Sequence, residues 1–253
     1  SKAQILFFEK EIFNMCGIVG YVGENSASPI LIDGLKKLEY RGYDSAGIAV
    51  SENGKTDVVK TKGRIKNLEE KLEEVGGLSG TIGIGHTRWA THGAPTDVNA
   101  HPHKGGNGRI TLVHNGIIEN YIELKTMLQK GGYVFVSETD TEVLAHLFDY
   151  YYKGDLLDAM VNVMKTVRGS YAVAILADDK PGTIIAARKD SPLIVGLGDG
   201  ENFLASDIPA VLKYTRDCYL LEDNQIAVLT KDNVTLYDTD KNGNATNRVN
   251  LAL

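Results

Sequence analysis

The first residue whose type and position suggest chemistry is a cysteine at the head of a glycine-rich apolar segment. Cys16 directly precedes residues 17–22, which read GIVGYV. A lone cysteine often acts as a small buried hydrophobe, and that alternative stays open. If Met15 were the initiator and were removed, Cys16 would carry a free α-amine with an unperturbed pKa near ~8. That amine could accept the thiol proton, so the sequence predicts a nucleophile that carries its own base.

A second candidate is the dense polar and aromatic run GHTRWATHG at residues 85–93. Arg88 offers a planar guanidinium that suits a carboxylate. Trp89, the only tryptophan, could cover a pocket, and Thr91 and His92 add donors. Taken singly, the arginine fits a surface ion pair and the tryptophan fits a core position. Their combination after an apolar strand favours a binding site.

Two further groups fit the same kind of site. An asparagine side chain and the next backbone N–H can form an oxyanion hole, which Asn115 and Gly116 could supply. On these two residues alone, a simple Asn-Gly turn is the stronger interpretation. Asp140, just before an apolar helical segment, could bind an ammonium group or cap that helix.

A metal or nucleotide cofactor is not expected. His101 and His103 form a His-x-His pair, but no third ligand has supporting spacing. The segment 83–85 lacks the third glycine of a dinucleotide loop, because Arg88 occupies that position. The sequence contains neither a Gly-x4-Gly-Lys-Ser/Thr loop nor a Gly-x-Ser-x-Gly elbow.

The segments that must position these residues are a mixture of expected strands and expected helices. An Asn-Gly pair at residues 53–54 predicts a tight hairpin between two strands. Helices are expected from Ser28-Pro29, from a capping-box pattern at residues 120–123, over residues 143–151 and from Asp155. Strands then dominate from residue 170 onward. This order predicts one α+β layered domain. The expected early strands span 17–22, 47–51, 56–61, 81–87 and 109–114.

Composition narrows the class of protein. The chain has 253 residues, an apolar fraction of 43% and a formal net charge of −6, so a basic nucleic-acid surface is not indicated. Cys16 and Cys218 are too few for a disulfide framework, and Cys218 is expected to be a buried structural thiol. No apolar stretch approaches the roughly 20 residues of a membrane helix. We therefore expect a cytoplasmic protein that contacts neither nucleic acid nor membrane.

Six motifs occur in order along the chain. They are MCGIVGY (15–21), LEYRGYDSAG (38–47), GHTRWATHG (85–93), NAHPH (99–103), HNGIIEN (114–120) and TDTE (139–142). With these motifs, residues 15 to about 238 closely resemble the N-terminal glutaminase domain of the glutamine–fructose-6-phosphate aminotransferase family. The resemblance implies a four-layer αββα sandwich of the N-terminal nucleophile hydrolase type, a class II glutamine amidotransferase.

The resemblance implies hydrolysis of L-glutamine to glutamate and ammonia through a thioester on Cys16. Asn115 and the Gly116 N–H would hold the oxyanion. Arg88 would bind the substrate α-carboxylate, and Asp140 its α-ammonium. In the family, a C-terminal sugar-isomerase domain uses the ammonia to make glucosamine 6-phosphate for amino-sugar biosynthesis, and the full-length protein is expected to be a homodimer or larger.

The resemblance implies supporting roles for five more residues. Thr91, His92 and His101 would complete the glutamine pocket. Trp89 would gate the passage of ammonia, and Arg41 would support the nucleophile electrostatically. No cofactor and no metal are implied.

Three regions are expected along the chain: an extension at 1–14, the glutaminase domain at 15–240 and the start of a linker to an isomerase domain at 241–253. The extension fits a cloning remnant with an upstream-extended start, or a propeptide removed by processing. With it attached, the nitrogen of Cys16 is a peptide nitrogen, which is not a general base. We therefore expect very low activity until Cys16 becomes the first residue.

Overall fold

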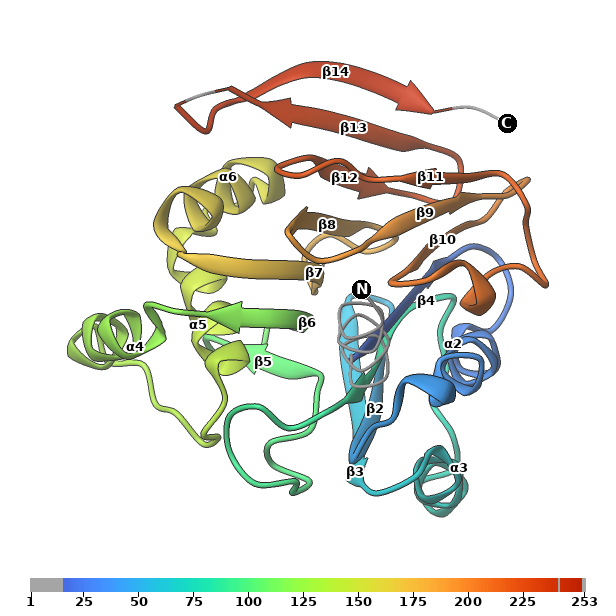
Figure 1. Ribbon diagram of the computed structural model, residues 1–253. Helices are drawn as coiled ribbons and strands as arrows, with labels where there is room; N and C mark the ends of the chain where they lie inside the picture. Colours follow the sequence, from blue (N-terminus) through green and yellow to red (C-terminus); the bar gives the residue numbers. More distant parts are fainter. Residues whose placement is uncertain (1–15, 241, 252–253) are drawn as a thin grey trace, which may run out of the picture.

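The computed structural model describes residues 16–240 and 242–251, which form two antiparallel seven-stranded sheets with helices outside them (Figure 1). The extension expected at residues 1–14 lies outside the described residues. The first sheet, sheet A, has the strand order β11-β9-β10-β1-β4-β2-β3. Its strands are β1 (Gly17–Val22), β2 (Ser45–Glu52), β3 (Lys55–Lys62), β4 (Ile82–Arg88), β9 (Ile194–Leu197), β10 (Asn202–Ala205) and β11 (Cys218–Leu220).

The second sheet, sheet B, has the order β14-β13-β12-β8-β7-β6-β5. Its long central strands are apolar and β-branched, as expected for strands that are covered on both faces. The strands are β5 (His103–Gly105), β6 (Ile110–Ile118), β7 (Gly169–Ala177), β8 (Ile184–Lys189), β12 (Ile226–Leu229), β13 (Val234–Thr239) and β14 (Ala245–Leu251).

Helices form the two outer layers, which confirms the predicted α+β sandwich. In sheet A, α2 packs on β1 and β4 while α3 packs on β3. In sheet B, α5 covers β5 and β6, α6 reaches β8, and α4 lies beside α5. No helix in the described ranges is long and apolar enough to span a membrane. The helices are α2 (Ala27–Lys36), α3 (Ile65–Glu74), α4 (Tyr121–Lys130), α5 (Asp140–Tyr151) and α6 (Leu156–Thr166), with 3-10 turns η1 (Glu39–Arg41) and η2 (Ile208–Ala210).

Three apolar clusters fill the spaces between the four layers. One lies between sheet A and its helices, and one between sheet B and its helices. The third lies between the two sheets, where small side chains alternate with larger ones. Ala172, Ala174, Ala186 and Ala227 from sheet B are fully buried in this inner layer. The two sheets can therefore approach closely along these strands.

The hairpin predicted at residues 53–54 is confirmed. Asn53 and Gly54 both have positive φ, 53° and 78°, and they join β2 to β3 in regular antiparallel register. Positive φ at both central residues is what a two-residue hairpin turn needs to match the twist of its strands.

Helix boundaries differ from expectation at two points. Helix α2 begins at Ala27, so Ser28 and Pro29 lie within its first turn. The capping box expected at 120–123 is wrong, because Asn120 makes no side-chain cap bond. Its amide instead donates to Thr166 O at 3.0 Å and accepts from Arg168 N at 2.9 Å. The Asn120 side chain therefore bonds the main chain at the end of α6 and just after it.

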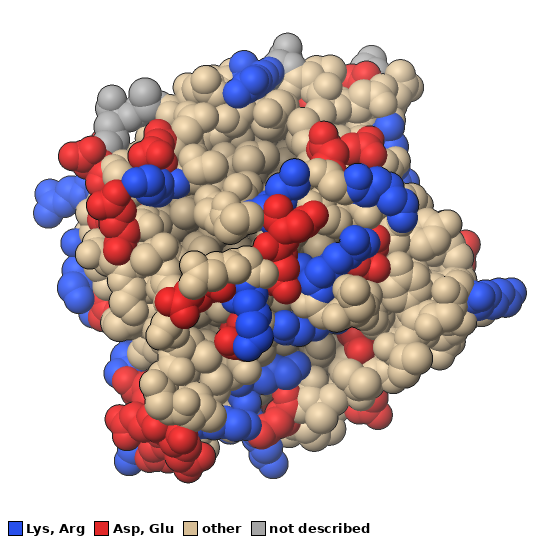
Figure 2. Space-filling model, turned by 180° about the vertical axis from the view of Figure 1, so that it is seen from behind, with Lys and Arg blue, Asp and Glu red and all other residues tan. Residues whose placement is uncertain are grey.

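Helix α3 and the strands β5, β11 and β14 were not anticipated. Helix α3 carries Ile65, Leu68 and Leu72 on its buried face, which is the spacing of an amphipathic helix. Residues 245–251, assigned from sequence to the start of a linker, form the edge strand β14 paired with β13. Its composition is polar because an edge strand exposes much of its surface to water. On the face seen in Figure 2, basic and acidic side chains lie interspersed, which accords with a modest net charge of −6.

Candidate active site

The candidate residues gather where the ends of β1 and β4 in sheet A meet β6 of sheet B. Cys16 directly precedes β1, whose first residue Gly17 pairs with Thr87 of β4. Arg88 is the last residue of β4. Strand β6 contacts both β1 and β4 and carries Asn115. Residues distant in sequence are thus brought together at one end of these strands.

The thiol of Cys16 lies against the main chain of Trp89. The Trp89 N–H donates to Cys16 Sγ at 3.2 Å, and Sγ lies 3.6 Å from Trp89 O. Burial raises the pKa of the Cys16 thiol to about 11, against opposing effects of the Trp89 hydrogen bond and the Arg88 charge. The sulfur is therefore protonated at neutral pH, and it needs a proton acceptor before it can attack.

Asn115 links the two sheets at the nucleophile. Its Nδ2 donates to the carbonyl oxygen of Cys16 at 2.9 Å, and its Oδ1 lies 2.9 Å from His86 Nε2. Only the N–H side of an amide can face a carbonyl, so His86 Nε2 must carry the proton that reaches Oδ1. Burial lowers the pKa of His86 to about 3, so the ring is neutral at physiological pH.

Gly116 lies within β6, opposite Tyr171 of β7, so the turn interpretation of the Asn-Gly pair is wrong. Its φ is 122°, and a Cβ placed on it would lie 2.2 Å from Ser170 O. No other residue fits this backbone without moving the neighbouring strand. The backbone at this position therefore requires glycine.

Arg88 is 3% exposed, and its guanidinium is only partly satisfied. Its Nη2 donates to His92 O and, at 3.2 Å, to Gly93 O. Its Nη1 is buried without a hydrogen-bond partner among the described residues. Burial lowers the pKa of Arg88, while the charges of Asp44, Cys16 and Asp140 raise it. A buried cationic donor without a partner suits an anionic ligand group.

Asp140 is the first residue of α5, but it is not the cap of that helix. Thr139 is the N-cap, and its side chain accepts the Glu142 N–H. Asp140 is buried, and its Oδ2 accepts the N–H of Ile118 at 2.9 Å. The carboxylate is therefore fixed at the end of β6, close enough to act on the charge of Arg88.

The loop that follows β4 carries three more predicted residues. Trp89 is 40% exposed, and Thr91 is also exposed. His92 packs edge-on against the ring of Tyr121 from α4, with ring centroids 5.1 Å apart. This loop therefore lies over the site with its aromatic residue open to solvent.

Arg41 bonds the main chain of Cys16 directly, whereas His101 acts through another residue. Arg41 Nη1 donates to Ser206 Oγ at 3.2 Å and to the Cys16 carbonyl at 3.4 Å, and its Nη2 pairs with Asp207 at 3.2 Å. His101 stacks on His86 with centroids 4.1 Å apart. His101 therefore packs on His86, the residue that bonds the Asn115 amide. Among the described residues, no group of His, Cys, Asp or Glu is arranged to hold a metal.

Sequence reasoning missed two residues that hold the nucleophile's surroundings in place. Asp44 accepts the Ala90 N–H at 2.6 Å, and its own N–H donates to Arg88 O at 2.8 Å. Ser206 Oγ accepts the Ile18 N–H at 3.0 Å. Asp44 lies within the motif at 38–47, so the sequence marked its position but did not indicate what its side chain does. Cys218 is half-buried in β11, and burial raises the pKa of its thiol.

Comparison with known proteins agrees with this geometry. A family model described as a glutamine amidotransferase domain matches residues 86–213. The chain belongs to this family. It is 61% identical over 226 residues to "Glutamine--fructose-6-phosphate aminotransferase [isomerizing]" of Clostridium tetani, and 57% identical to the protein of that name from Thermus thermophilus. Each match covers 89% of this chain and 37% of the relative, so the chain spans well under half of their length.

Solved structures share the fold. Glutamine phosphoribosylpyrophosphate amidotransferase from B. subtilis, complexed with ADP and GMP, matches with a TM-score of 0.75 and 28% identity, covering 87% of this chain and 48% of that one. A glutamine aminotransferase class-II domain protein from Silicibacter pomeroyi matches in fold alone, with a TM-score of 0.61 and 13% identity. The four layers are thus the αββα sandwich of the N-terminal nucleophile hydrolase type.

Proposed function

We propose that this chain is the glutaminase part of an isomerizing glutamine–fructose-6-phosphate aminotransferase, with Cys16 as its nucleophile. The observation that carries the proposal is the contact of Asn115 Nδ2 with the Cys16 carbonyl at 2.9 Å. It sets an oxyanion donor from sheet B beside a nucleophile from sheet A. The relatives of that name, at more than half identity, support the choice of reaction.

The chemical steps follow from the groups at this edge. The Cys16 sulfur attacks the side-chain amide carbon of glutamine while its proton passes to the α-amine of the same residue. The negative oxygen that forms is stabilised by Asn115 Nδ2 and the Gly116 N–H. When the C–N bond breaks, the α-amine returns the proton to the departing ammonia. Water then hydrolyses the Cys16 thioester, which releases glutamate and restores the thiol.

Recognition of glutamine rests on two opposite charges. Arg88 Nη1, which lacks a partner among the described residues, would donate to the α-carboxylate. Asp140 would accept from the α-ammonium. Thr91 and His92 would complete the pocket, and the buried His101 would support it through His86. The exposed Trp89 would gate the exit of ammonia.

The pKa of the Cys16 thiol explains why the α-amine is needed. A thiol with a pKa of about 11 has a negligible thiolate fraction at neutral pH. A peptide nitrogen cannot take its proton, so the active form would begin at Cys16. Arg41, bonded to the Cys16 carbonyl, would hold the residue in place once the upstream chain is gone.

The ammonia would be used outside this chain. The name of the relatives specifies amino transfer to fructose 6-phosphate with isomerization, and this chain covers 37% of their length. A sugar-isomerase domain would therefore follow in the full protein, which we propose to be a homodimer or larger and cytoplasmic.

The test compares two forms of the protein. One is the 253-residue chain, and the other is processed to begin at Cys16. We expect the processed form to release ammonia from L-glutamine and to form a thioester detectable by mass spectrometry, and the longer form to be nearly inactive. A Cys16→Ala variant of the processed form is the control. Equal turnover by both forms, or turnover by the alanine variant, would refute the proposal.

A further inference from the structure

The two charged groups proposed to bind glutamine come from different layers of the sandwich. Arg88 ends β4 in sheet A, and Asp140 begins α5 over sheet B. The carboxylate and ammonium of an amino acid are bonded to one carbon, so their binding groups must keep a fixed separation. A displacement of 1 Å can cost about 100-fold in rate. What ties the two segments together therefore matters.

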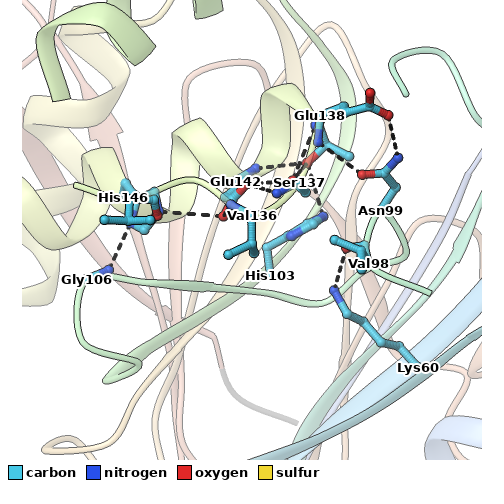
Figure 3. A network of polar contacts seen from close by, with 12 residues as sticks. Lys60, Val98, Asn99, His103, Gly106, Val136, Ser137, Glu138, Glu142 and His146 are labelled. Carbon is cyan, nitrogen blue, oxygen red and sulfur yellow. Dashed lines mark hydrogen bonds and ion pairs between the residues drawn. The ribbon is translucent and has the colours of Figure 1, made fainter. Parts of the chain in front are cut away.

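Asn99 joins these segments through a reciprocal pair of hydrogen bonds with Glu138 (Figure 3). Asn99 Oδ1 accepts the Glu138 N–H at 3.0 Å, and Asn99 Nδ2 donates to Glu138 Oε2 at 3.1 Å. The second N–H of Nδ2 donates to Ala94 O at 2.9 Å. Asn99 is 3% exposed and Glu138 is exposed, so the bonds anchor a surface carboxylate segment to a buried amide. Its side chain uses both donors and one acceptor position.

The connection is continuous on the Arg88 side. Arg88 Nη2 donates to Gly93 O at 3.2 Å. Gly93 lies directly against the bridge, since a Cβ placed there would be 2.7 Å from Asn99 Nδ2 and 2.9 Å from Glu138 Cβ. The loop that holds the guanidinium therefore rests on Asn99 and Glu138 without a gap.

The connection is equally continuous on the Asp140 side. Glu142 of α5 accepts hydrogen bonds from Val136 N at 2.8 Å, Ser137 N at 2.7 Å and Ser137 Oγ at 2.6 Å. Burial would raise the pKa of Glu142, but its hydrogen bonds lower it to about 2 and keep it ionised. Figure 3 shows this network next to Glu138. The residues between Val136 and Asp140 are thus fixed to the helix.

A second residue holds the same loop but does not bridge the segments. Lys60 of β3 donates to Val98 O at 3.0 Å and to Ala100 O at 2.6 Å. These bonds tie the loop to sheet A, from which Arg88 already comes. Asn99, by contrast, ties it to the segment of Asp140.

We propose that Asn99 is a positioning residue that sets the separation of Arg88 and Asp140, and so selects substrates with both an α-carboxylate and an α-ammonium. This inference rests on the proposed glutaminase function. It assigns Asn99 no contact with the substrate.

The variant Asn99→Asp tests the proposal in the form that begins at Cys16. Aspartate has the same shape but cannot donate to Ala94 O, and its carboxylate faces that of Glu138. The assay compares L-glutamine with glutaramate, which is glutamine without its ammonium group. We expect kcat/KM for glutamine to fall about tenfold or more. The value for glutaramate, held by Arg88 alone, should change much less, so the selectivity ratio falls.

The matched control is Asn202→Asp. Asn202 is equally buried and bridges two segments, donating to Thr230 O at 2.7 Å and Lys231 O at 3.3 Å, far from the site in the fold. This variant should lose stability without changing selectivity. The double variant Asn99→Asp with Glu138→Gln should recover part of the selectivity. The side-chain amide introduced at position 138 can donate to the carboxylate introduced at position 99.

Each outcome decides the matter. If Asn99→Asp does not fold, Glu138→Ala removes one bond of the same pair and should lower the ratio by a smaller factor. An unchanged ratio in the folded variants, or an equal fall in Asn202→Asp, would overturn the positioning role while leaving the glutaminase proposal intact. A parent protein that hydrolyses neither amide would overturn both.

Discussion

The side-chain amide of Asn115, in sheet B, donates a hydrogen bond to the main-chain carbonyl of Cys16, which lies 99 positions earlier in the chain and directly precedes β1 of sheet A. His86 fixes the opposite end of the amide at 2.9 Å. The proposed oxyanion donor is therefore oriented before a substrate arrives. Such preorganisation lets a donor stabilise charge without a cost of reorientation during the reaction.

The first prediction concerns this donor. Replacing Asn115 with alanine should lower kcat for glutamine by about 100- to 1000-fold with a small change in KM, because the donor acts mainly on the transition state. Steady-state ammonia release from the form that begins at Cys16 measures this. A fall below tenfold, in a variant with unchanged thermal unfolding, would contradict the oxyanion role.

The second prediction concerns the substrate carboxylate. Arg88→Lys should lower kcat/KM for glutamine by roughly 100-fold, because an ammonium cannot keep both the Gly93 carbonyl and a bidentate carboxylate. An amide without the α-carboxylate, 4-aminobutyramide, should be unaffected. Arg168→Lys is the control, since Arg168 is exposed and its guanidinium pairs with Glu123 at 3.1 Å. Equal losses for both amides would argue against a carboxylate at Arg88.

The third prediction concerns the backbone of β6. Gly116→Ala should lower the free energy of unfolding by about 3 kcal/mol or more, since the new Cβ would lie 2.2 Å from Ser170 O. Gly132→Ala is matched, with a φ of 90° and no atom within 4 Å of the new Cβ. It should cost about 1 kcal/mol for conformation alone. Denaturant unfolding compares the two, and similar losses would show that the site tolerates the methyl group.

The fourth prediction concerns pH. Burial lowers the pKa of His86 to about 3 and holds the pKa values of His101, His103 and His114 below the usual range. Below pH 6.5 the unfolded chain binds protons that the folded protein does not, so stability falls as pH falls. The expected loss is about 1 to 2 kcal/mol per imidazole between pH 6.5 and 5.

Urea unfolding at pH 7.5, 6 and 5 checks this trend. Glu142 does not contribute within the window, because its pKa moves downward from an ordinary value of 4.5. The variant His101→Gln should flatten the curve. Stability that stays level or rises toward pH 5 would show that the imidazoles accept protons in the folded state.

Much of the fold could be predicted from local sequence signals. The turn at Asn53 and Gly54 was recognisable because only a few residues accept positive φ. The order of strands, then helices, then strands predicted an α+β layered domain, and the resemblance implied its four layers. The six motifs between residues 15 and 142 carried the resemblance to the family, which the comparisons confirm.

The rest could not be predicted because it depends on contacts between distant segments. Asn115 and Gly116 look like a turn in sequence, but pairing with β7 keeps them in a strand. Asn120 looks like a cap, but its amide bonds residues 166 and 168 instead. The reciprocal pair of Asn99 and Glu138 spans 39 positions and has no local signal. Helix α3, in contrast, had a clear apolar spacing and was overlooked.

The alanines on the inner face of sheet B have a consequence for how the chemistry could be tuned. Cys16 belongs to one sheet and Asn115 to the other, and Ala172 and Ala174 lie in the layer that separates those sheets. The thickness of this apolar layer therefore sets the distance between the Cys16 sulfur and the Asn115 amide. A methyl group added at one of these buried alanines would change that distance, and with it the reaction rate, without touching the substrate.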